Sequence, residues 1–308
     1  MKEMLVQTAS VYGKRNSLSK RKAFLSLFSE QIRRLGFNVQ IDEGYTSIKK
    51  YSAVYGTPKD ASAIFVTGYD TGSAAILPNH RYYPLHIRKS AQNDLIDLWI
   101  RILIGGLLLL LVYYLTKLPF IEAHKIFRYG LILLFVVSFF FLLRGIGCKY
   151  NFNRNTAAIV TLYEAAEALK GNKKYAFVYA DDTMKSPIGY KRVSKVLGPS
   201  VSNIPVIIVE AVGSGEKLYL AHRKSQDEEA KRILSHFKGL DIEDVSLSDE
   251  EAENSVLGYF AKTFILTSGE MSNGQIVCTK TRSYASLECD IDRLEMIRDG
   301  IVSLVEKR

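Results

Sequence analysis

Leu98–Thr116 reads LWIRILIGGLLLLLVYYLT, and after a short connection Tyr129–Leu143 reads YGLILLFVVSFFFLL. Each stretch contains fifteen consecutive uncharged residues, 102–116 and 129–143. A helix of this length covers only about 22 Å, whereas a bilayer core needs roughly 20 apolar residues, so flanking residues have to complete each span. Because both stretches are apolar on every side, they predict a transmembrane helical hairpin with spans at about 98–116 and 127–144. A hydrophobic hairpin within a soluble core is the alternative interpretation.

The ends of both stretches carry the kinds of residue that membrane proteins place at the interface. These are Trp99, Tyr113, Tyr114 and Tyr129, together with Arg101, Lys117, Arg128 and Arg144. Met1–Arg34 lacks the pattern of a signal peptide, so we expect the sequence before the hairpin to stay in the cytosol. Two spans then return the chain to the same side. The predicted location is the cell membrane, with two spans and a cytoplasmic soluble domain, although the basic loop Lys117–Arg128 disfavours this orientation.

The chain of 308 residues has a formal net charge of +9. A basic surface suits nucleic acid or anionic lipid. Since there is no RNA-binding signature and no dense basic helix, we expect no nucleic-acid partner and take the lipid bilayer as the partner. The three cysteines, Cys148, Cys278 and Cys289, lack the spacing of a zinc ribbon, which favours a reducing compartment over a disulfide framework.

Outside the hairpin, short apolar runs alternate with helical patterns. This alternation predicts an α/β fold in which a mixed, mostly parallel sheet carries helices on both faces. Lys217–Leu220 is expected to form a hairpin with Pro205–Glu210, and residues 72–97 are expected to be irregular. The expected strands are 37–41, 52–55, 63–67, 175–179, 205–210, 217–220, 263–266 and 275–279, and the expected helices are 19–35, 155–169, 227–237 and 291–305.

The helical pattern Asn155–Leu169, NTAAIVTLYEAAEAL, resembles the helix NASGVAALLELARAL of the di-zinc aminopeptidase-like family of clan MH. That family includes bacterial leucyl aminopeptidases, glutaminyl cyclases and the metal-poor ectodomains of the transferrin receptor and nicastrin. Residues 64–71, 177–189 and 207–213 are similar, in the same order, to its His-x-Asp-Thr turn, its Glu-Glu loop and its Asn-x-Asp-x-x-Gly strand. The resemblance implies one aminopeptidase-like domain formed by residues 1–94 and 148–308, into which the hairpin at 95–147 is inserted.

The family binds two zinc ions through two histidines and three carboxylates, and most of these ligands are replaced. The resemblance puts Gly68 at the first histidine, Arg154 at the bridging aspartate, and Thr183 and Met184 at the glutamate pair that supplies the general base. The last histidine would fall near residues 284–286, where the sequence has none. These replacements imply that the peptidase chemistry is lost and that no zinc cofactor is held.

Four carboxylates remain near the predicted strand ends. Asp70 matches the family residue that orients a histidine ligand, and Glu210 is a conservative match to a ligand aspartate. Asp181 and Asp182 precede the expected glutamate pair, so a displaced loop would still allow a zinc site. Our preferred hypothesis is that Arg154 pairs with these carboxylates in place of metal. The vestigial pocket is predicted to contain Gly68, Asp70, Arg154, Asn155, Asp181, Asp182, Thr183, Met184 and Glu210.

The sequence therefore predicts a membrane-anchored pseudopeptidase that binds a peptide or another membrane protein as an accessory subunit. One alternative is an active, membrane-bound zinc metallopeptidase with unusual ligands. A further alternative is a scaffold whose spans carry the function, in which Gly105, Gly106 and Gly130 allow close helix contacts, either between the two spans or with a partner.

The insertion point of the hairpin, between Asp70 and Asn155, is expected to turn the rim of the pocket toward the bilayer. His80 and His86, which follow Asp70, are expected to be ordinary surface residues.

Overall fold

A nine-stranded mixed β-sheet forms the centre of the molecule. The computed structural model describes residues 1–45, 49–77, 80–148, 151–184, 187–282 and 288–307. Neighbouring strands follow the order β1-β2-β4-β3-β5-β8-β6-β7, and β9 pairs with β8. The strands are β1 (Val39–Tyr45), β2 (Lys49–Tyr55), β3 (Ala63–Gly68), β4 (Tyr175–Ala180), β5 (Val206–Glu210), β6 (Lys217–Arg223), β7 (Ile242–Leu247), β8 (Thr263–Ser272) and β9 (Gln275–Val277).

The middle of the sheet is parallel, as the sequence predicts. β4, β3, β5 and β8 run in one direction. β2 runs antiparallel to both β1 and β4, whereas β6 runs antiparallel to β8 but parallel to β7. The central strands are buried on both faces, so alternate side chains point into two separate cores. Phe65 and Phe177 belong to one core, and Val66 and Val178 belong to the other.

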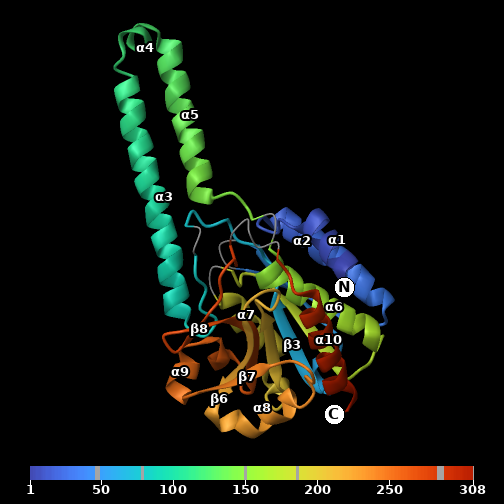
Figure 1. The fold of residues 1–308 in the computed structure, drawn as a ribbon. Coiled ribbons are helices and arrows are strands. Elements are labelled where there is room, and N and C mark those ends of the chain that lie inside the picture. Colours follow the sequence, from blue (N-terminus) through green and yellow to red (C-terminus); the bar gives the residue numbers. More distant parts are fainter. Residues whose placement is uncertain (46–48, 78–79, 149–150, 185–186, 283–287, 308) are drawn as a thin grey trace.

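Helices cover both faces of the sheet (Figure 1). The core of Phe65 lies under α1, α2, α6, α8 and α10, and the core of Val66 lies under α7 and α9. The mixed α/β fold with helices on both faces is therefore confirmed. The helices are α1 (Lys2–Tyr12), α2 (Leu18–Arg34), α6 (Ala157–Leu169), α7 (Ile188–Leu197), α8 (Asp227–Leu234), α9 (Asp249–Glu253) and α10 (Ile291–Glu306), with short turns η1 (Pro58–Asp60), η2 (Phe152–Thr156, a π-helix), η3 (Pro199–Val201), η4 (Lys224–Gln226) and η5 (Val256–Tyr259).

Several elements differ from the sequence prediction. β6 does not pair with β5, because β8 lies between them, with Thr267 opposite both Glu210 and Tyr219. The expected hairpin of these two strands is therefore wrong. Helix α1 and strand β7 occupy segments where no element was predicted. Strand β7 lies at the sheet edge and is mostly part-exposed, so its sequence lacks the apolar run that marks the central strands.

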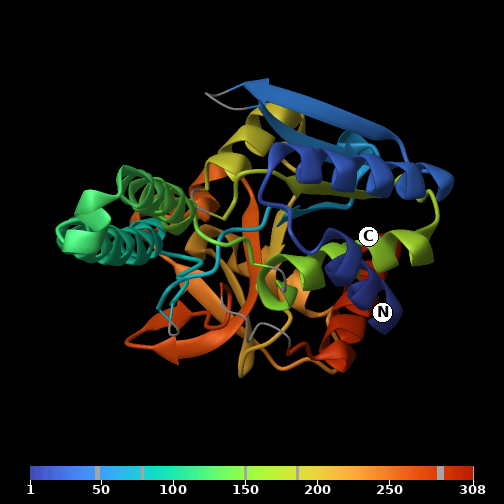
Figure 2. The ribbon, with the colours of Figure 1, turned by 90° about the horizontal axis from the view of Figure 1, so that it is seen from above.

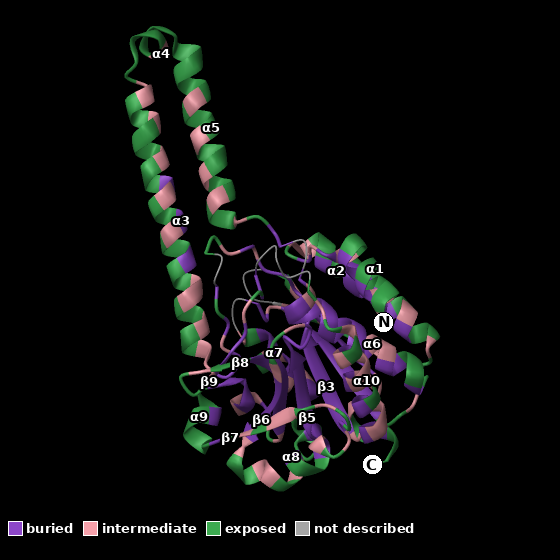
Figure 3. Cartoon of the chain, viewed as in Figure 1, coloured by how far each residue is buried: buried purple, intermediate pink, exposed green. Residues whose placement is uncertain are grey.

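Helices α3 (Ile87–Leu115), α4 (Pro119–Ala123) and α5 (Lys125–Arg144) form the predicted hairpin. The hairpin projects from the domain in Figure 1, and seen from above it stands on one side, with α1 and α2 on the other (Figure 2). Both α3 and α5 are long and apolar enough to cross a membrane. In the most apolar 18-residue stretch of each helix, only 17% of the residues of α3 and 0% of those of α5 are buried. Figure 3 shows both helices largely exposed. Neither helix is a core helix of this domain.

Helix α3 begins at Ile87, well before the predicted span at 98, so the expectation of an irregular segment up to residue 97 is wrong for its last part. The 29 residues of α3 give a length of about 43 Å, compared with a hydrocarbon core of about 30 Å. The 20 residues of α5 give about 30 Å. The first turns of α3 are thus surplus to a span, and they pack on the domain instead.

The two long helices contact each other at one of the three predicted glycines. Gly105 is buried, and a β-carbon added there would overlap the ring of Phe139 on α5. Around Gly106 and Gly130, no heavy atom of the described residues lies within 4 Å of such a β-carbon. Gly105 therefore packs the hairpin together, whereas the surfaces at the other two are open.

We expect Gly105→Leu to destabilise the hairpin by about 1–3 kcal/mol, because the added side chain is forced into the Phe139 ring. The matched control is Gly106→Leu, which adds the same side chain one position along, where there is space. The measurement is the free energy of unfolding in detergent micelles. Equal effects of the two substitutions would contradict the helix contact seen here.

Candidate functional site

Three buried carboxylates lie at the carboxyl edge of the parallel strands. Asp70 follows β3, Asp181 follows β4 directly, and Glu210 is the last residue of β5. β3 and β4 pair in register as far as Gly68 and Ala180, so the ends of neighbouring strands meet here. This edge is where open α/β sheets form their ligand sites.

Asp70 fixes the loop that follows β4. Its carboxylate accepts hydrogen bonds from the backbone N of Thr183 at 3.0 Å, from Thr183 Oγ1 at 2.7 Å and from the backbone N of Met184 at 3.2 Å. Its main-chain oxygen accepts a hydrogen bond from Nδ2 of Asn155. A β-carbon at Gly68 would overlap the Thr183 hydroxyl. Gly68, at the position that the family resemblance assigns to the first histidine, thus packs against Thr183, which belongs to the position of the glutamate pair.

Asp181 and Asp182 bind cations of the protein itself. Arg21 Nη1 lies 2.6 Å from Asp181 Oδ1, and the backbone N of Tyr51 donates to the other oxygen at 3.1 Å. Lys50 Nζ lies 2.9 Å from Asp182 Oδ1. Burial raises the pKa of Asp181, and the ion pair with Arg21 opposes that shift. The pKa of Arg21 is lowered by burial but raised more by Asp181, so the net direction is upward.

Arg154 and Glu210 meet through Tyr82 rather than directly, and Tyr190 is a second donor to Glu210. Tyr82 donates to Glu210 Oε1 at 2.6 Å, and Tyr190 donates to Oε2 at 3.0 Å. The guanidinium carbon of Arg154 lies 3.6 Å from the centre of the Tyr82 ring, a cation–π contact. Its Nη2 donates to the main-chain oxygen of Thr183 at 3.1 Å. Both partners of this arrangement are almost fully buried.

The direct pairing of Arg154 with carboxylates, our preferred hypothesis from the sequence, is not what the structure has. Among the described residues, the ion pairs at this edge are made by Arg21, Lys50 and Arg282. Burial lowers the pKa of Arg154, but the surrounding acidic groups, Tyr82 first and then Glu210, raise it more, so it stays above its ordinary value. Burial raises the pKa of the Tyr82 hydroxyl well above its usual range, so this phenol is neutral and donates to Glu210.

A third buried guanidinium belongs to Arg15, in the turn between α1 and α2. Its side chain donates to the main-chain oxygens of Tyr69 and Tyr12, and to Thr156 Oγ1 at 3.2 Å. Burial lowers the pKa of Arg15 to about 10, although the nearby charge of Asp70 opposes that shift. Arg15, like Arg21 and Arg154, therefore carries a positive charge at neutral pH beside the strand ends.

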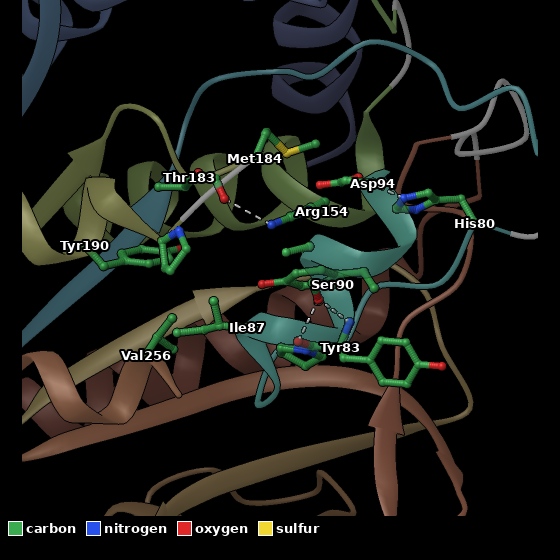
Figure 4. A pocket seen from close by; sticks show the side chains of 14 residues that line it. His80, Tyr83, Ile87, Ser90, Asp94, Arg154, Thr183, Met184, Tyr190 and Val256 are labelled. Atoms are coloured by element: carbon green, nitrogen blue, oxygen red, sulfur yellow. Dashed lines mark hydrogen bonds and ion pairs between the residues drawn. The ribbon is translucent and has the colours of Figure 1, made fainter. Parts of the chain in front are cut away.

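A pocket with a volume of about 90 Å³ opens next to Arg154. One wall comes from the first turns of α3, where Ile87, Ser90 and Asp94 repeat at helical spacing (Figure 4). The opposite wall is formed by Arg154 and by the loop and helix after β4. The described lining residues are His80, Tyr82, Tyr83, Pro84, Ile87, Ser90, Ala91, Asp94, Arg154, Thr183, Met184, Pro187, Tyr190 and Val256.

His80 is buried and is not the surface residue expected from the sequence. Its Nε2 lies 3.0 Å from Asp94 Oδ1 of α3, and Asp94 also pairs with Arg282. The expectation failed because the partner of His80, Asp94, lies in the first turns of α3, which were not predicted. His86, directly before α3, is half-buried, and burial lowers its pKa.

A second buried ion pair joins the hairpin to the domain. Arg101 Nε lies 2.9 Å from Asp97 Oδ2, one helical turn away. The same guanidinium donates to the main-chain oxygen of Leu142 on α5 at 2.9 Å and to that of Ala74 at 2.7 Å. The backbone N of Ile76 donates to the other oxygen of Asp97 at 2.6 Å. One arginine therefore connects α3, α5 and the loop after β3.

The remaining chemistry of the described residues is limited. Among them, no group of three or more His, Cys, Asp and Glu side chains is placed to hold a metal ion. Burial raises the pKa of Cys278, which lies beside the site, to about 12, and burial also raises the pKa of Cys289 to about 12. Cys148 is buried as well. Cysteine nucleophiles need a lowered pKa and access to solvent. The pKa of both Cys278 and Cys289 is raised instead, and Cys278 is also buried.

The chain is similar in structure to a Zn-dependent exopeptidase from Parabacteroides distasonis, with a TM-score of 0.57 and 12% identity over 99% of this chain and 96% of that one. It is also similar to a glutaminyl cyclase of Bacteroides thetaiotaomicron bound to N-acetylhistamine, with a TM-score of 0.60 and 11% identity over 99% and 96% of the chains. A leucine aminopeptidase precursor of Bacteroides thetaiotaomicron gives a TM-score of 0.60 and 11% identity over 99% and 95%.

The chain has the aminopeptidase-like fold. The sequence resemblance to that family is thereby confirmed at the level of fold. No protein-family model matches the sequence, and no curated protein is significantly similar to it. These solved structures are only 10–12% identical to the chain, so they show its fold and not its chemistry. What the site can do depends on the residues described above.

The structure places the predicted pocket residues in two groups. The first group surrounds Asp70 and Arg154, and the second consists of Asp181 and Asp182 with their cations. The position expected for the family's last histidine, near 284–286, lies outside the described residues. The first group contains Gly68, Asp70, Arg154, Asn155, Thr183, Met184 and Glu210.

Arg15, Arg21 and both tyrosines on Glu210 were not predicted from the sequence. Arg21 did carry a signal, because it precedes Phe24, Leu25 and Phe28 at helical spacing on the apolar face of α2. A cation on a buried face needs a buried anion, and Asp181 fulfils that need. Arg15 lies in a turn without periodicity and gave no comparable signal.

We expect Tyr190→Phe to lower the free energy of unfolding by about 1–3 kcal/mol, because a buried carboxyl oxygen of Glu210 loses its donor. Tyr163→Phe is the control, since the Tyr163 hydroxyl is not seen bonded to a described residue and its ring stays packed on Phe28. Chemical denaturation of the two variants is the measurement. A Tyr190→Phe protein as stable as the control would contradict the donor role of Tyr190.

We also expect Cys278 and Cys289 to be unreactive in the folded protein. With a pKa of about 12, the thiolate fraction at neutral pH is roughly 10³-fold lower than for an ordinary thiol. Iodoacetamide labelling followed by mass spectrometry, with the denatured chain as control, measures this difference. Rapid labelling of Cys278 in the native protein would show that its surroundings are more open than described.

Proposed function

We propose that this chain is a membrane-anchored, non-catalytic binding protein built on the aminopeptidase-like fold, which holds a peptide or a membrane protein as an accessory subunit. The observation that carries the proposal is the set of buried guanidinium groups of Arg15, Arg21 and Arg154 beside the carboxylates at the strand ends. These side chains supply the positive charge that two metal ions would otherwise bring to such a site.

The donor set at this edge does not fit a zinc ion. Zinc sites use imidazole, thiolate and carboxylate groups that are free to coordinate. Here the oxygens of Asp70, Asp181 and Glu210 already accept hydrogen bonds from the protein. Binding a metal would require breaking these contacts and placing a cation beside Arg154. Zinc therefore has no part in the proposed function, and none of these residues has a catalytic role in it.

Membrane anchoring is supported by the length and exposure of the hairpin. Two apolar helices that leave the domain with most of their surface uncovered require an apolar environment. Two helices of about 43 and 30 Å, joined by the short α4, suit a bilayer core of about 30 Å. The alternative of two core helices in a soluble domain does not suit helices that project from it.

A binding role is supported by the position of the pocket. Its walls combine a few convergent polar groups, among them Arg154 and Asp94, with apolar side chains such as Ile87 and Val256, a pattern typical of ligand sites. One wall belongs to α3, which continues into the predicted span. A peptide or protein segment held there would be kept close to the bilayer.

The first test is the zinc content of detergent-purified protein after incubation with zinc and desalting, measured by elemental mass spectrometry. We expect far less than one zinc per chain, because the carboxylates are engaged. Aminoacyl-amide hydrolysis is assayed on the same sample, and no hydrolysis is expected. Zinc near one or two per chain, with hydrolysis, would instead support the active metallopeptidase.

The substitution Arg154→Asp tests whether the positive charge of Arg154 is required for the stability of the fold. Removing one partner of a buried charge arrangement costs about 3–5 kcal/mol, so we expect this variant to be much less stable than Arg154→Lys, which keeps the charge. The free energies of unfolding of both variants are compared. An Arg154→Asp protein as stable as the wild type would remove the main support for the proposal.

A further inference from the structure

The end of the domain from which the hairpin projects is formed by three segments that lie side by side. The return of the hairpin, residues 145–148, is bonded to the loop after β3, since Ala74 N donates to the main-chain oxygen of Ile146 at 2.8 Å. A β-carbon at Gly147 would overlap Asn16, in the turn between α1 and α2. Figure 1 shows this turn and the base of α5 at the same end of the domain.

The length of α5 determines where this surface lies relative to the bilayer. This helix has 20 residues, and its length of about 30 Å matches the hydrocarbon thickness. When α5 spans the bilayer, its last residue, Arg144, lies at the hydrocarbon boundary. The segments bonded to residues 145–148 then lie at the depth of the lipid headgroups.

The composition of this surface suits such a position. The segments 10–20, 72–77 and 144–148 contain no aspartate or glutamate. None of Lys14, Lys20 and Arg144 forms an ion pair with a described residue. Val11 is 62% exposed and Ile146 is 64% exposed, although both are large and apolar. Cations interleaved with exposed apolar side chains are typical of surfaces that lie in the membrane interface.

We infer that this end of the domain docks on the bilayer through anionic phospholipid, with a headgroup held in the hollow between α1 and α2. That hollow has a volume of about 410 Å³ and is lined by Val11, Tyr12, Lys14 and Lys20 among others. The occupant is an anionic lipid because the unpaired charges are positive, and because the surface continues directly from the spans. This inference rests on the proposed membrane anchor and adds the lipid class that it selects.

Docking of this kind sets the orientation of the domain as well as its location. The hairpin, which Arg101 joins to the domain, holds the chain in the bilayer at one place, and a second contact through the α1–α2 turn limits the tilt of the chain relative to the membrane. Each lysine close to an anionic surface strengthens the association about fivefold, so the two lysines together contribute about 25-fold.

The experiment uses the full chain reconstituted into nanodiscs of phosphatidylcholine alone, or of phosphatidylcholine with phosphatidylserine. Amide hydrogen exchange of residues 10–20 is the measurement. We expect slower exchange in the phosphatidylserine nanodiscs, reversed by high salt. The double variant Lys14→Gln/Lys20→Gln should lose this protection, with docking weakened by about 25-fold.

The matched control is Lys173→Gln/Lys174→Gln, which removes two exposed lysines directly before β4, at the opposite edge of the sheet. This variant should respond to phosphatidylserine as the wild type does. Equal exchange in the two kinds of nanodisc, or an unchanged response of Lys14→Gln/Lys20→Gln, overturns the lipid site. A chain that is not taken up into nanodiscs overturns the membrane anchor as well, so the two failures are distinguishable.

Discussion

Burying carboxylates at the ends of three strands is costly unless positive charge or hydrogen-bond donors are buried with them. In this chain the compensation comes from side chains of distant segments. Arg15 belongs to the turn after α1, Arg21 to the start of α2, and Arg154 to the segment that follows the hairpin. Charge balance at the sheet edge therefore requires the N-terminal helices, the central strands and the return from the hairpin to be placed together, and a change at any one of them disturbs the others.

The buried charges where the hairpin joins the domain must be compensated in the same way. Asp97 and Arg101 are buried on a helix that is otherwise apolar from this point onward. A buried charged pair in so apolar a segment is tolerated when every polar atom is bonded. The guanidinium meets that condition by donating to carbonyl oxygens of α5 and of the loop after β3. Because those acceptors lie on separate segments, the bonds that satisfy the charge also fix the angle at which the hairpin leaves the domain.

The sequence identifies the central strands because each is a short apolar run, and the hairpin because it is apolar on all sides. Asp70, Asp181 and Glu210 were predictable at the site, since the ends of parallel strands share one edge. The contacts of Arg154 were not predictable, because Tyr82 reaches the site through an isolated pairing with Cys278, which has no periodic signal. The early start of α3 was missed for a similar reason. Residues 87–97 are mostly polar and read as a loop, but in the structure they form a helix that contacts His80 and Arg282 through Asp94.

These constraints together favour a binding role over a catalytic one. A hydrolytic site needs unoccupied acceptors and a group able to take a proton, whereas this edge has engaged carboxylates and arginines that remain charged at neutral pH. A binding cleft needs a defined shape and a stable charge distribution. Carboxylates and arginines that are already bonded within the protein provide both. α3 forms one wall of the pocket and also continues into the apolar hairpin. Asp94 faces the pocket, and Asp97 and Arg101, one and two turns further along α3, bond the hairpin to the domain.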